Sequence, residues 1–228
     1  MKFKHLAVSM AMACGAASSL AVPVTLAGST FDITYDSALV GLFGAPVLVG
    51  SQLSWFPSGS PGFSAQTAAG FGVTNSTFAL QATAHPGYQL AGFSLAEAGD
   101  YFYFGSGATV AVSGQLRVTP LPGATATAPI AVTGGFVANP LFDFSTTNWT
   151  AAAGPVALPA DTTYANVSVQ NILASYVPSG NVGYAFIEKK DVFLTVITTP
   201  VPEPETYALM LAGVGVVGFV ALRRRKRN

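Results

Sequence analysis

Few residues of this sequence are of a type that could carry acid–base or nucleophilic chemistry. Between residues 28 and 200 there is one histidine, His85, and no cysteine, because the only cysteine of the chain is Cys14. A Ser-His-Asp mechanism needs a histidine that a third group orients, whereas His85 precedes Pro86-Gly87, a pair typical of an exposed turn. Zinc sites also need several histidine or cysteine ligands. We therefore expect neither a nucleophilic triad nor a metal or other cofactor.

Paired carboxylates are the remaining route to catalysis, because glycoside hydrolysis needs only two acidic residues. Asp32 and Asp36 lie four residues apart on a predicted strand, so they share its solvent-facing side. Glu97 and Asp100 flank an Ala-Gly pair that predicts a turn. These acids have ordinary surface explanations, so we expect no enzymatic activity. A glycoside hydrolase is the less favoured alternative and requires two carboxylates that face each other across a cleft.

The charges between the termini exclude one class of partner. Between residues 28 and 200, three basic residues, Arg117, Lys189 and Lys190, stand against eight acidic ones. Nucleic-acid binding requires a basic surface that neutralises phosphates, so we expect no nucleic-acid partner. Glu188 directly precedes the two lysines and is predicted to form a surface ion pair with them.

Aromatic side chains offer another kind of site, a platform on which a sugar ring stacks. Residues 101–104 are four consecutive aromatics, so two of them should point outward if they form a strand. We expect most aromatic residues to form the core and rim of the domain, with a carbohydrate-binding surface as the alternative. The candidates for such a surface are Trp55, Phe56, Tyr88, Tyr101, Phe102, Tyr103, Phe104 and Trp149.

The elements that must position these side chains are predicted to be strands. Apolar and polar residues alternate with a period of two in several segments, as half-buried strands require. Turn-forming residues between them favour reversals. We therefore expect an all-β ectodomain, an antiparallel β-sandwich or jelly roll, with residues 119–129 as a long loop or, alternatively, a hairpin. The expected strands include residues 31–36, 78–82, 110–118, 167–170, 184–189 and 192–197, and the expected turns are residues 57–62, 85–87, 105–107, 134–135 and 178–181.

The N-terminus has the layout of a secretory signal peptide. Two lysines among the first four residues precede an uncharged, alanine-rich run over residues 6–20, which predicts a signal helix. Thr25-Leu26-Ala27 matches the small-x-Ala pattern that signal peptidase cleaves, and Ser19-Leu20-Ala21 is the alternative site. We therefore assign residues 1–27 as a signal peptide, with cleavage by signal peptidase after Ala27.

Three segments follow one another in strict order at the C-terminus. Residues 201–206 are acidic and proline-rich, residues 207–222 are uncharged and mostly apolar, and a basic cluster follows. A helix over residues 207–222 is roughly 24 Å long, and bilayer thinning or snorkelling of Arg223 can extend it across a hydrocarbon core of roughly 30 Å. We therefore expect one transmembrane helix with the basic cluster in the cytoplasm. The basic cluster comprises Arg223, Arg224, Arg225, Lys226 and Arg227.

Pro202, Glu203 and Pro204, the apolar segment and the basic cluster together resemble the PEP-CTERM sorting signal of Gram-negative bacteria. The resemblance implies recognition by an exosortase, a membrane enzyme of the cysteine-transpeptidase type that cleaves near the Pro-Glu-Pro segment. It also implies a host that makes exopolysaccharide and biofilm. Some proteins with this tail are described as having an ice-binding protein C-terminal domain. Glu205 stands where serine is common in the family, which leaves the resemblance intact.

These features predict a chain of three parts: a signal peptide (residues 1–27), a β-rich extracytoplasmic domain (28–199) and a sorting tail (200–228). We expect export across the inner membrane, a transient single-pass stage, and then residence at the cell surface or in the extracellular matrix. The expected function is structural or adhesive, within a biofilm, with exopolysaccharide as a partner. A carbohydrate-binding module and a simple membrane-anchored periplasmic protein are the alternatives.

Overall fold

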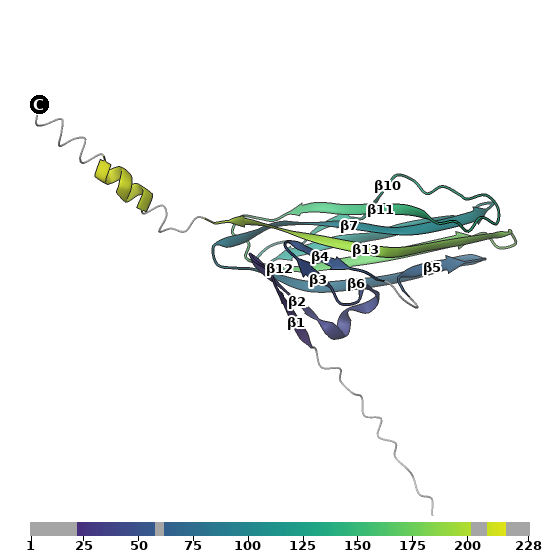
Figure 1. Cartoon of the computed structure of the whole chain (residues 1–228), viewed down its shortest axis with the longest axis horizontal. Coiled ribbons are helices and arrows are strands. Elements are labelled where there is room, and N and C mark those ends of the chain that lie inside the picture. Colours follow the sequence, from purple (N-terminus) through teal and green to yellow (C-terminus); the bar gives the residue numbers. More distant parts are fainter. Residues whose placement is uncertain (1–21, 58–61, 202–208, 218–228) are drawn as a thin grey trace, which may run out of the picture.

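The chain forms two antiparallel β-sheets, drawn in Figure 1. The computed structural model describes residues 22–57, 62–201 and 209–217. Strands dominate these residues, and two short 3-10 turns, Ser37–Leu39 and Gly41–Phe43, follow the second strand. The prediction of an all-β, antiparallel fold is therefore confirmed.

The first sheet has six strands, and its longest strands lie at its centre. Strand β12 pairs with β6 on one side and with β8 on the other. The expected strands at residues 31–36, 78–82, 110–118 and 167–170 all belong to this sheet. In spatial order the strands are β1 (Pro23–Ala27), β2 (Phe31–Asp36), β6 (Gly70–Ala84), β12 (Tyr164–Val177), β8 (Thr109–Pro120) and β9 (Ala126–Pro129).

The second sheet has seven strands and is built around the pairing of β7 with β13. These two strands are each 18 residues long and pair along almost their whole length. In spatial order the strands are β10 (Ala131–Thr133), β11 (Thr147–Ala157), β7 (Tyr88–Gly105), β13 (Gly183–Pro200), β4 (Gln52–Trp55) and β3 (Val47–Val49), and β5 (Ser64–Thr67) pairs with the first half of β13.

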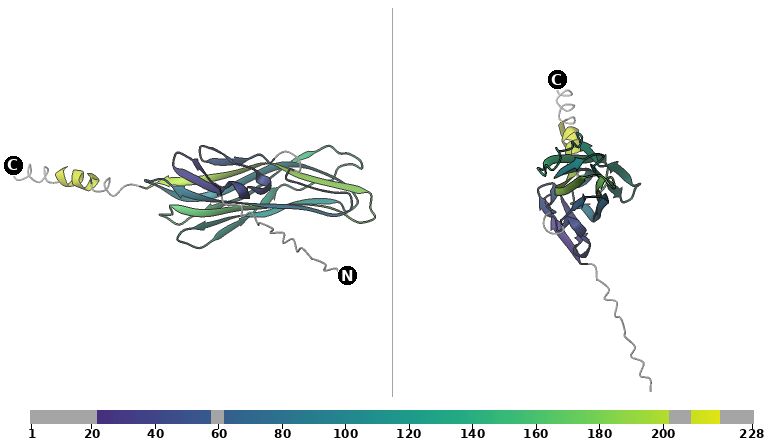
Figure 2. Two further views of the ribbon diagram at one scale, coloured as in Figure 1. Left: turned by 90° about the horizontal axis from the view of Figure 1, so that it is seen from below. Right: turned by 90° about the vertical axis from the view of Figure 1, so that its right-hand side faces the viewer.

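The inward-facing residues of both sheets form one hydrophobic core. Alternation places every second side chain of β2, of the second half of β6 and of most of β12 in this core, as a period of two dictates. Figure 2 shows the result, an elongated body in which the long strands run along its length. Members of the core include Phe31 and Ile33 of β2, Phe78 of β6, Leu116 of β8, Val169 of β12, Leu95 of β7 and Leu194 of β13.

Residues 119–129 form the hairpin that was the alternative to a long loop. Strand β8 continues to Pro120, and β9 returns antiparallel to it. The turns expected at residues 85–87, 105–107 and 178–181 connect consecutive strands. Within the turn expected at residues 57–62, residues 58–61 lie outside the described residues.

The terminal segments are described only in part. Residues 1–21 of the predicted signal peptide lie outside the described residues, and Ala27 is the last residue of β1. Residues 209–217 are helical. Across the described portion of the chain, no helix combines the length and apolar character needed to cross a bilayer. Residues 207–208 and 218–222, the remainder of the predicted span, lie outside that portion.

The turn predicted between Glu97 and Asp100 is wrong, because both residues lie inside strand β7. Gly99 has a different purpose there. A Cβ atom at this position would lie 2.0 Å from the carbonyl oxygen of Glu188 and 2.9 Å from the indole ring of Trp149. Glycine is therefore needed for a close approach of the strand to its neighbours, as is common for glycine within strands.

Gly99→Ala should lower the free energy of unfolding by about 1–3 kcal/mol or more, because the added methyl group overpacks the core against backbone atoms that cannot move away. Gly135→Ala is the matched control, since a Cβ there meets nothing within 4 Å. That control should change stability by less than about 0.5 kcal/mol. Urea denaturation of both variants measures the difference, and equal stabilities would contradict the packing role of Gly99.

Candidate functional site

A cluster of aromatic side chains covers one end of the outer face of the seven-stranded sheet. Tyr101 and Tyr103 point into the core between the sheets, so Phe102 and Phe104 point outward from β7. We call the outward set the outer aromatic cluster. It consists of Phe102, Phe104, Phe142, Phe144, Tyr184 and Phe186.

The rings of the cluster pack in layers. Phe102 stacks on Tyr184 and Phe186, with centroid distances of 5.8 and 5.4 Å. Phe144 lies edge-on against Phe102 and Phe104, at 5.5 and 5.1 Å. Such offset and edge-to-face arrangements are the favourable geometries for aromatic pairs. Phe102 and Phe104 therefore form a buried base, and the rings above them form the accessible layer.

The accessible layer is exposed well beyond what a core residue would be. Phe142 is 63% exposed and Phe144 is 57% exposed, and the neighbouring Leu141 and Val182 are exposed by 57% and 64%. Contiguous exposed apolar surface on a soluble domain marks an interaction site. The outer aromatic cluster is therefore a candidate interaction surface.

The segment between β10 and β11 carries Phe142 and Phe144 to this face. Strand β11 begins at Thr147, opposite Tyr101, and so leaves the last residues of β7 without a strand on that edge. The connecting segment occupies this edge, where the amide of Asn139 donates to the carbonyl oxygen of Tyr103 at 2.7 Å. It thereby brings two phenylalanines over the outward face of β7.

Hydrogen bonds within this segment fix the position of the two rings. The Asn139 side-chain amide donates to the carbonyl oxygen of Ser145 at 2.7 Å. The amide of Ser145 donates to Oδ1 of Asp143 at 2.8 Å, and hydrogen bonds from Ser145 hold the pKa of Asp143 below its usual value. Phe142 adopts a left-handed conformation with φ of 64°. Hydrogen bonds within the connecting segment therefore hold Phe142 and Phe144 in place.

The same segment is anchored on its other side to the inward tyrosines. The hydroxyl of Tyr103 donates to the carbonyl oxygen of Phe136 at 3.0 Å, and the hydroxyl of Tyr101 accepts from the amide of Val137 at 3.0 Å. Burial, and then the neighbouring hydroxyl of Tyr101, raise the pKa of Tyr103. The consecutive aromatics of β7 thus fasten the connecting segment from both faces.

Three charged residues lie beside the outer aromatic cluster. Glu188 pairs in register with Asp100 across β13 and β7. The Lys190 ammonium lies 2.5 Å from Oδ2 of Asp100 and 3.1 Å from Oε1 of Glu188. Oδ1 of Asp100 is buried and has no hydrogen-bond partner within the described residues. One group of three charged side chains thus lies beside the aromatic surface.

The pKa values of this charged group reflect its crowding. Burial of the Glu188 carboxyl, together with the adjacent carboxyl of Asp100, raises the pKa of Glu188. Hydrogen bonds to Asp100 and then to Glu188 raise the pKa of Lys190. One ammonium therefore neutralises only part of the charge of two neighbouring carboxylates.

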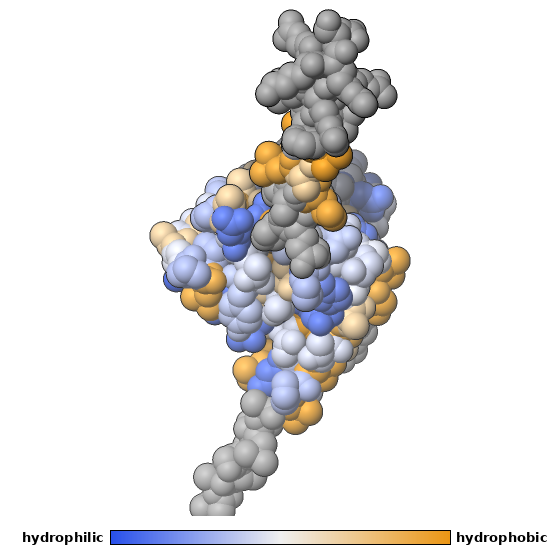
Figure 3. All heavy atoms as spheres, turned by 90° about the vertical axis from the view of Figure 1, so that its left-hand side faces the viewer, coloured by the Kyte–Doolittle hydropathy of each residue, from blue (hydrophilic) through white to orange (hydrophobic). Residues whose placement is uncertain are grey.

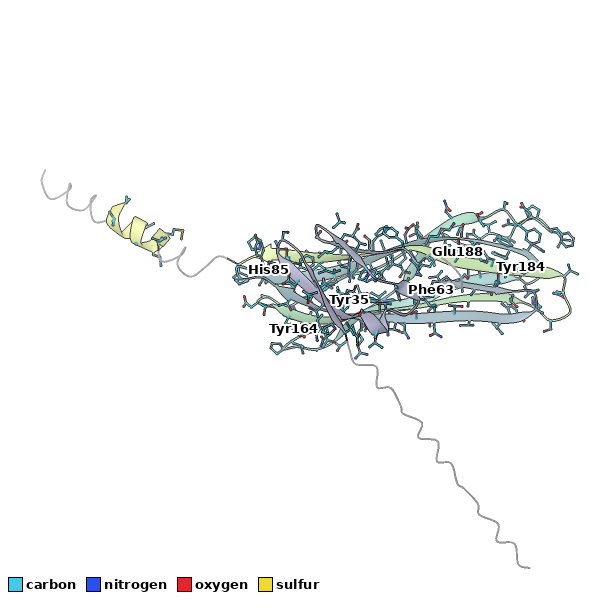
Figure 4. The ribbon with its side chains drawn as sticks, turned by 60° about the horizontal axis from the view of Figure 1, so that its bottom comes forward. Tyr35, Phe63, His85, Tyr164, Tyr184 and Glu188 are labelled. Atoms are coloured by element: carbon cyan, nitrogen blue, oxygen red, sulfur yellow. The ribbon has the colours of Figure 1, made fainter. Side chains whose placement is uncertain are left out.

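The site lies at the end of the body that is remote from the C-terminal tail. Figure 4 shows Tyr184 and Glu188 toward one end and His85 at the other, where β13 also ends. Figure 3 looks onto the end at which β13 stops, and hydrophilic residues cover most of it, with hydrophobic ones at its rim. The exposed aromatic surface and the start of the tail therefore occupy opposite ends.

This arrangement combines the two kinds of group that contact with a sugar ring requires. The C–H groups on one face of a pyranose are apolar and pack against aromatic rings, while its hydroxyls need hydrogen-bond partners. Phe144 and Tyr184 provide the apolar surface, and the half-buried Glu188 beside them provides an acceptor. Binding sites of this kind combine apolar surface with a few polar groups.

Half of the eight aromatic candidates from the sequence belong to the core instead. Trp55, Tyr101, Tyr103 and Trp149 are buried members of it. Phe56 is exposed and lies 6.3 Å from Phe193, away from the other rings. Phe102 and Phe104 belong to the site but only as its buried base, and Tyr88 is half-buried at the start of β7.

The accessible residues of the site were missed in the sequence. Phe142 and Phe144 lie in a segment without strand alternation, so nothing in the sequence indicates which surface they cover. Tyr184 and Phe186 had a usable signal, because they alternate with Ala185 and Ile187 and so share the face of Glu188. That alternation places two aromatics and a carboxylate on one face of one strand.

The single histidine and the first two acids have structural contacts. Nε2 of His85 lies 2.9 Å from Oδ1 of Asp32, and both side chains are partly exposed. Oδ1 of Asp36 accepts from the amide of Ala38 at 2.9 Å and caps the first 3-10 turn. A search of the described residues finds no group of three or more potential metal ligands.

The surface ion pair predicted for Glu188 is correct for Lys190 but wrong for Lys189. Lys189 points into the core and pairs with Glu97, and both side chains are fully buried. Asn171 of β12 completes this interior polar cluster. The reason is strand alternation, since Lys189 shares the inward face of Ala185 and Ile187, and a bulge after Lys189 leaves Lys190 outside.

A groove lies on the outer face of the six-stranded sheet. This groove has a volume of about 440 Å³, and Thr34, Gln81, Arg117 and Asn166 are among its lining residues. Asp36 also lines it, so charges of both signs are present. Its lining does not favour one class of ligand.

Comparison with known proteins identifies the C-terminal tail. The sequence model of the PEP-CTERM protein-sorting motif matches residues 200–226. No curated protein and no solved structure matches the chain. The chain therefore carries a PEP-CTERM sorting motif, which implies an exported protein with exosortase as its processing partner. Pro202, Glu203, Pro204 and the basic cluster at residues 223–227 lie outside the described residues.

Glu188→Gln should change how stability depends on pH. Because the pKa of Glu188 is raised in the folded protein, the folded state holds this proton more tightly than the unfolded chain does. Its contribution to stability is therefore present at low pH and is lost as the pH rises above the ordinary value of 4.5. The variant has no carboxyl group to lose this proton. The difference in the free energy of unfolding between the variant and the wild type should therefore increase from about pH 4 to about pH 7, the range in which a carboxyl group with a raised pKa titrates. Urea denaturation across this range measures it, and parallel curves would refute the assignment.

Proposed function

We propose that this exosortase-sorted chain is a non-enzymatic component of the cell surface or exopolysaccharide matrix that adheres to polysaccharide through the outer aromatic cluster. The observation that carries the proposal is the aromatic layer formed by the exposed Phe142 and Phe144 and the half-buried Tyr184, beside Glu188. In this proposal the protein is a structural or adhesive component of a biofilm, and it adheres because its domain binds carbohydrate.

The position of the cluster on β13 supports this role. Tyr184 lies near the beginning of this strand, and the sorting motif begins at its last residue, Pro200. At about 3.3 Å per residue, the strand separates the two by roughly 50 Å. While the tail is held by the membrane, the aromatic surface is therefore presented away from the point of attachment.

The geometry of the acids gives little support to a glycoside hydrolase. Retaining and inverting enzymes hold two carboxyl groups at least about 5 Å apart, on either side of the scissile bond. Asp100 and Glu188 instead share one ammonium group, within 2.5 and 3.1 Å of their oxygens.

For the location of the protein, the alternative is a periplasmic protein that stays anchored by its tail. Analysis of its processing in cells distinguishes this anchored protein from one that the exosortase releases.

The arrangement of the sheets supports a β-sandwich as the architecture of the ectodomain, since both sheets contribute to one core.

The position of strand β1 helps to choose between the two candidate signal-peptidase sites. It pairs with β2 over Pro23–Ala27, and Leu26 packs against the core. Cleavage after Ala27 removes this strand, whereas cleavage after Ala21 retains it. We therefore favour the alternative site, Ser19-Leu20-Ala21.

Intact-mass analysis and fractionation of producing cells, with and without the exosortase, test the sorting proposal. We expect a mature chain that begins at Val22, ends close to Pro204 and leaves the inner membrane only when the exosortase is present. The same mass distinguishes cleavage after Ala21 from cleavage after Ala27. A chain that keeps its tail in the inner membrane of both strains would contradict exosortase processing and favour the anchored periplasmic protein.

Phe144→Ala tests the adhesive surface, with the host's own exopolysaccharide as the probe. Burying a phenylalanine is worth about 1.5–3 kcal/mol, so the loss should weaken binding about tenfold or more. Phe144 is 57% exposed, so the fold should tolerate its removal.

The matched control for this experiment is Phe71→Ala. Phe71 is 77% exposed and lies on β6 of the other sheet, where it packs 4.4 Å from Tyr176. Its removal should leave polysaccharide binding unchanged. If both variants bind as the wild type does, or if the wild type shows no binding, the aromatic cluster is not the adhesive surface.

A further inference from the structure

Three polar side chains meet inside the core, where burial normally excludes them. Glu97 comes from β7, Lys189 from β13 and Asn171 from β12 of the opposite sheet. Their exposed fractions are 2%, 1% and 0%. The ammonium group of Lys189 lies 5.2 Å from the ring centre of Trp149 and 5.9 Å from that of Phe63. The group is therefore shielded from water by aromatic rings.

The three side chains form a closed ring of hydrogen bonds. Nζ of Lys189 donates to Oε2 of Glu97 and, at 2.8 Å, to Oδ1 of Asn171. Nδ2 of Asn171 donates to Oε1 of Glu97 at 2.7 Å. One carboxylate oxygen thus contacts the amine and the other contacts the carboxamide nitrogen.

This environment favours the uncharged amine. Burial lowers the pKa of Lys189, and the attraction of Glu97 offsets only part of this effect. An isolated buried charge is costly, and a buried ion pair often fails to recover its desolvation cost. Transfer of one proton from Lys189 to Glu97 removes both charges and leaves a nucleophilic nitrogen beside a carboxamide.

We propose that Lys189 and Asn171 react to form an intramolecular isopeptide bond, with Glu97 as the acid–base catalyst. Oε2 of Glu97 accepts a proton from the Lys189 ammonium, and the neutral Nζ attacks Cγ of Asn171. The C–N bond forms as the carbonyl becomes tetrahedral. Protonated Glu97 delivers its proton to Nδ2, and the resulting carboxylate accepts the second proton from Nζ. The bond from Cγ to Nδ2 breaks as the carbonyl re-forms, and ammonia takes up that second proton from Glu97 and leaves as ammonium. The product is a secondary amide, Glu97 is regenerated, and no oxidant or other reactant is consumed.

The positions of the atoms suit this reaction. Nζ lies 2.8 Å from Oδ1 of Asn171, and with a C=O bond of about 1.2 Å the distance from Nζ to Cγ is at most about 4.0 Å. A near-attack geometry requires about 3–3.5 Å, so only a small approach is needed. The three strands that carry these residues are fixed by long ladders on both sheets.

The bond would join the two sheets covalently. Asn171 belongs to the six-stranded sheet and Lys189 to the seven-stranded sheet. The segment from residue 28 to residue 200 has no cysteine, so a disulfide cannot serve this purpose. The cross-link is independent of the proposed adhesive function, because the interior cluster shares no residue with the outer aromatic cluster.

Peptide mapping of the wild-type protein purified from producing cells tests this proposal directly. After denaturation, a protease that cuts after aromatic residues places Asn171 on the peptide of residues 165–176 and Lys189 on that of residues 187–193. We expect one branched species whose mass is the sum of the two peptides minus one ammonia. Recovery of both as separate, unmodified peptides would overturn the proposal, whatever the variants do.

Two pairs of variants assign the roles. Lys189→Met and Asn171→Ala should abolish the branched species, whereas their neighbours on the same strands, Lys190→Met and Asn166→Ala, should retain it. Glu97→Gln should keep both reacting groups and still lose at least most of the product. Loss of ammonia from Asn171 by cyclisation to a succinimide would persist in Lys189→Met, and that result would also overturn the isopeptide assignment.

Discussion

The pairing of β7 with β13 is the interaction on which the other features of this structure depend. The two strands run antiparallel along almost their full length and form the centre of the seven-stranded sheet. Because side chains alternate across a strand, this one ladder sorts two sets of residues onto opposite faces. Glu97 and Lys189 enter the core, while Asp100, Glu188 and the aromatic residues of the outer cluster face outward. A slip of one residue in this register would exchange the two faces and abolish both sites.

Burying the polar cluster of Glu97, Lys189 and Asn171 in the core costs free energy. Each charge taken from water into the interior costs several kcal/mol, and well-placed hydrogen bonds recover only part of this cost. Glu97, Lys189 and Asn171 satisfy one another in a closed ring, so their positions are mutually defined. Apolar residues would fill the same space more cheaply. The proposed isopeptide bond gives these three groups a purpose that apolar residues could not serve, because it needs an amine, a carboxamide and a carboxyl group in contact across the two sheets.

The strands could be predicted to a useful extent from the sequence, and the errors have identifiable causes. Alternation at residues 31–36 gave a strand with the observed bounds. A glycine beside acidic residues is typical of turns and predicts a turn at Gly99, yet this glycine lies within β7 and permits the close approach of Trp149 and Glu188. Charge predicts a surface position for Lys189, whereas the period of two places its side chain on the face of Ala185 and Ile187, which is the inward face in the structure. Periodicity and not charge decides where this side chain lies.

The sequence by itself determined the sorting motif at residues 200–226 and the all-β class of the domain, because both depend on local patterns of residue type. Only the tertiary structure decided which side chains meet. Glu97 and Lys189 are separated by 92 residues, and Glu97 and Asn171 by 74. Phe144 reaches Tyr184 because its connecting segment wraps the free edge of β7. Such contacts depend on the order and register of strands, and the free energy that selects this order is distributed over the whole core, so no local pattern encodes it.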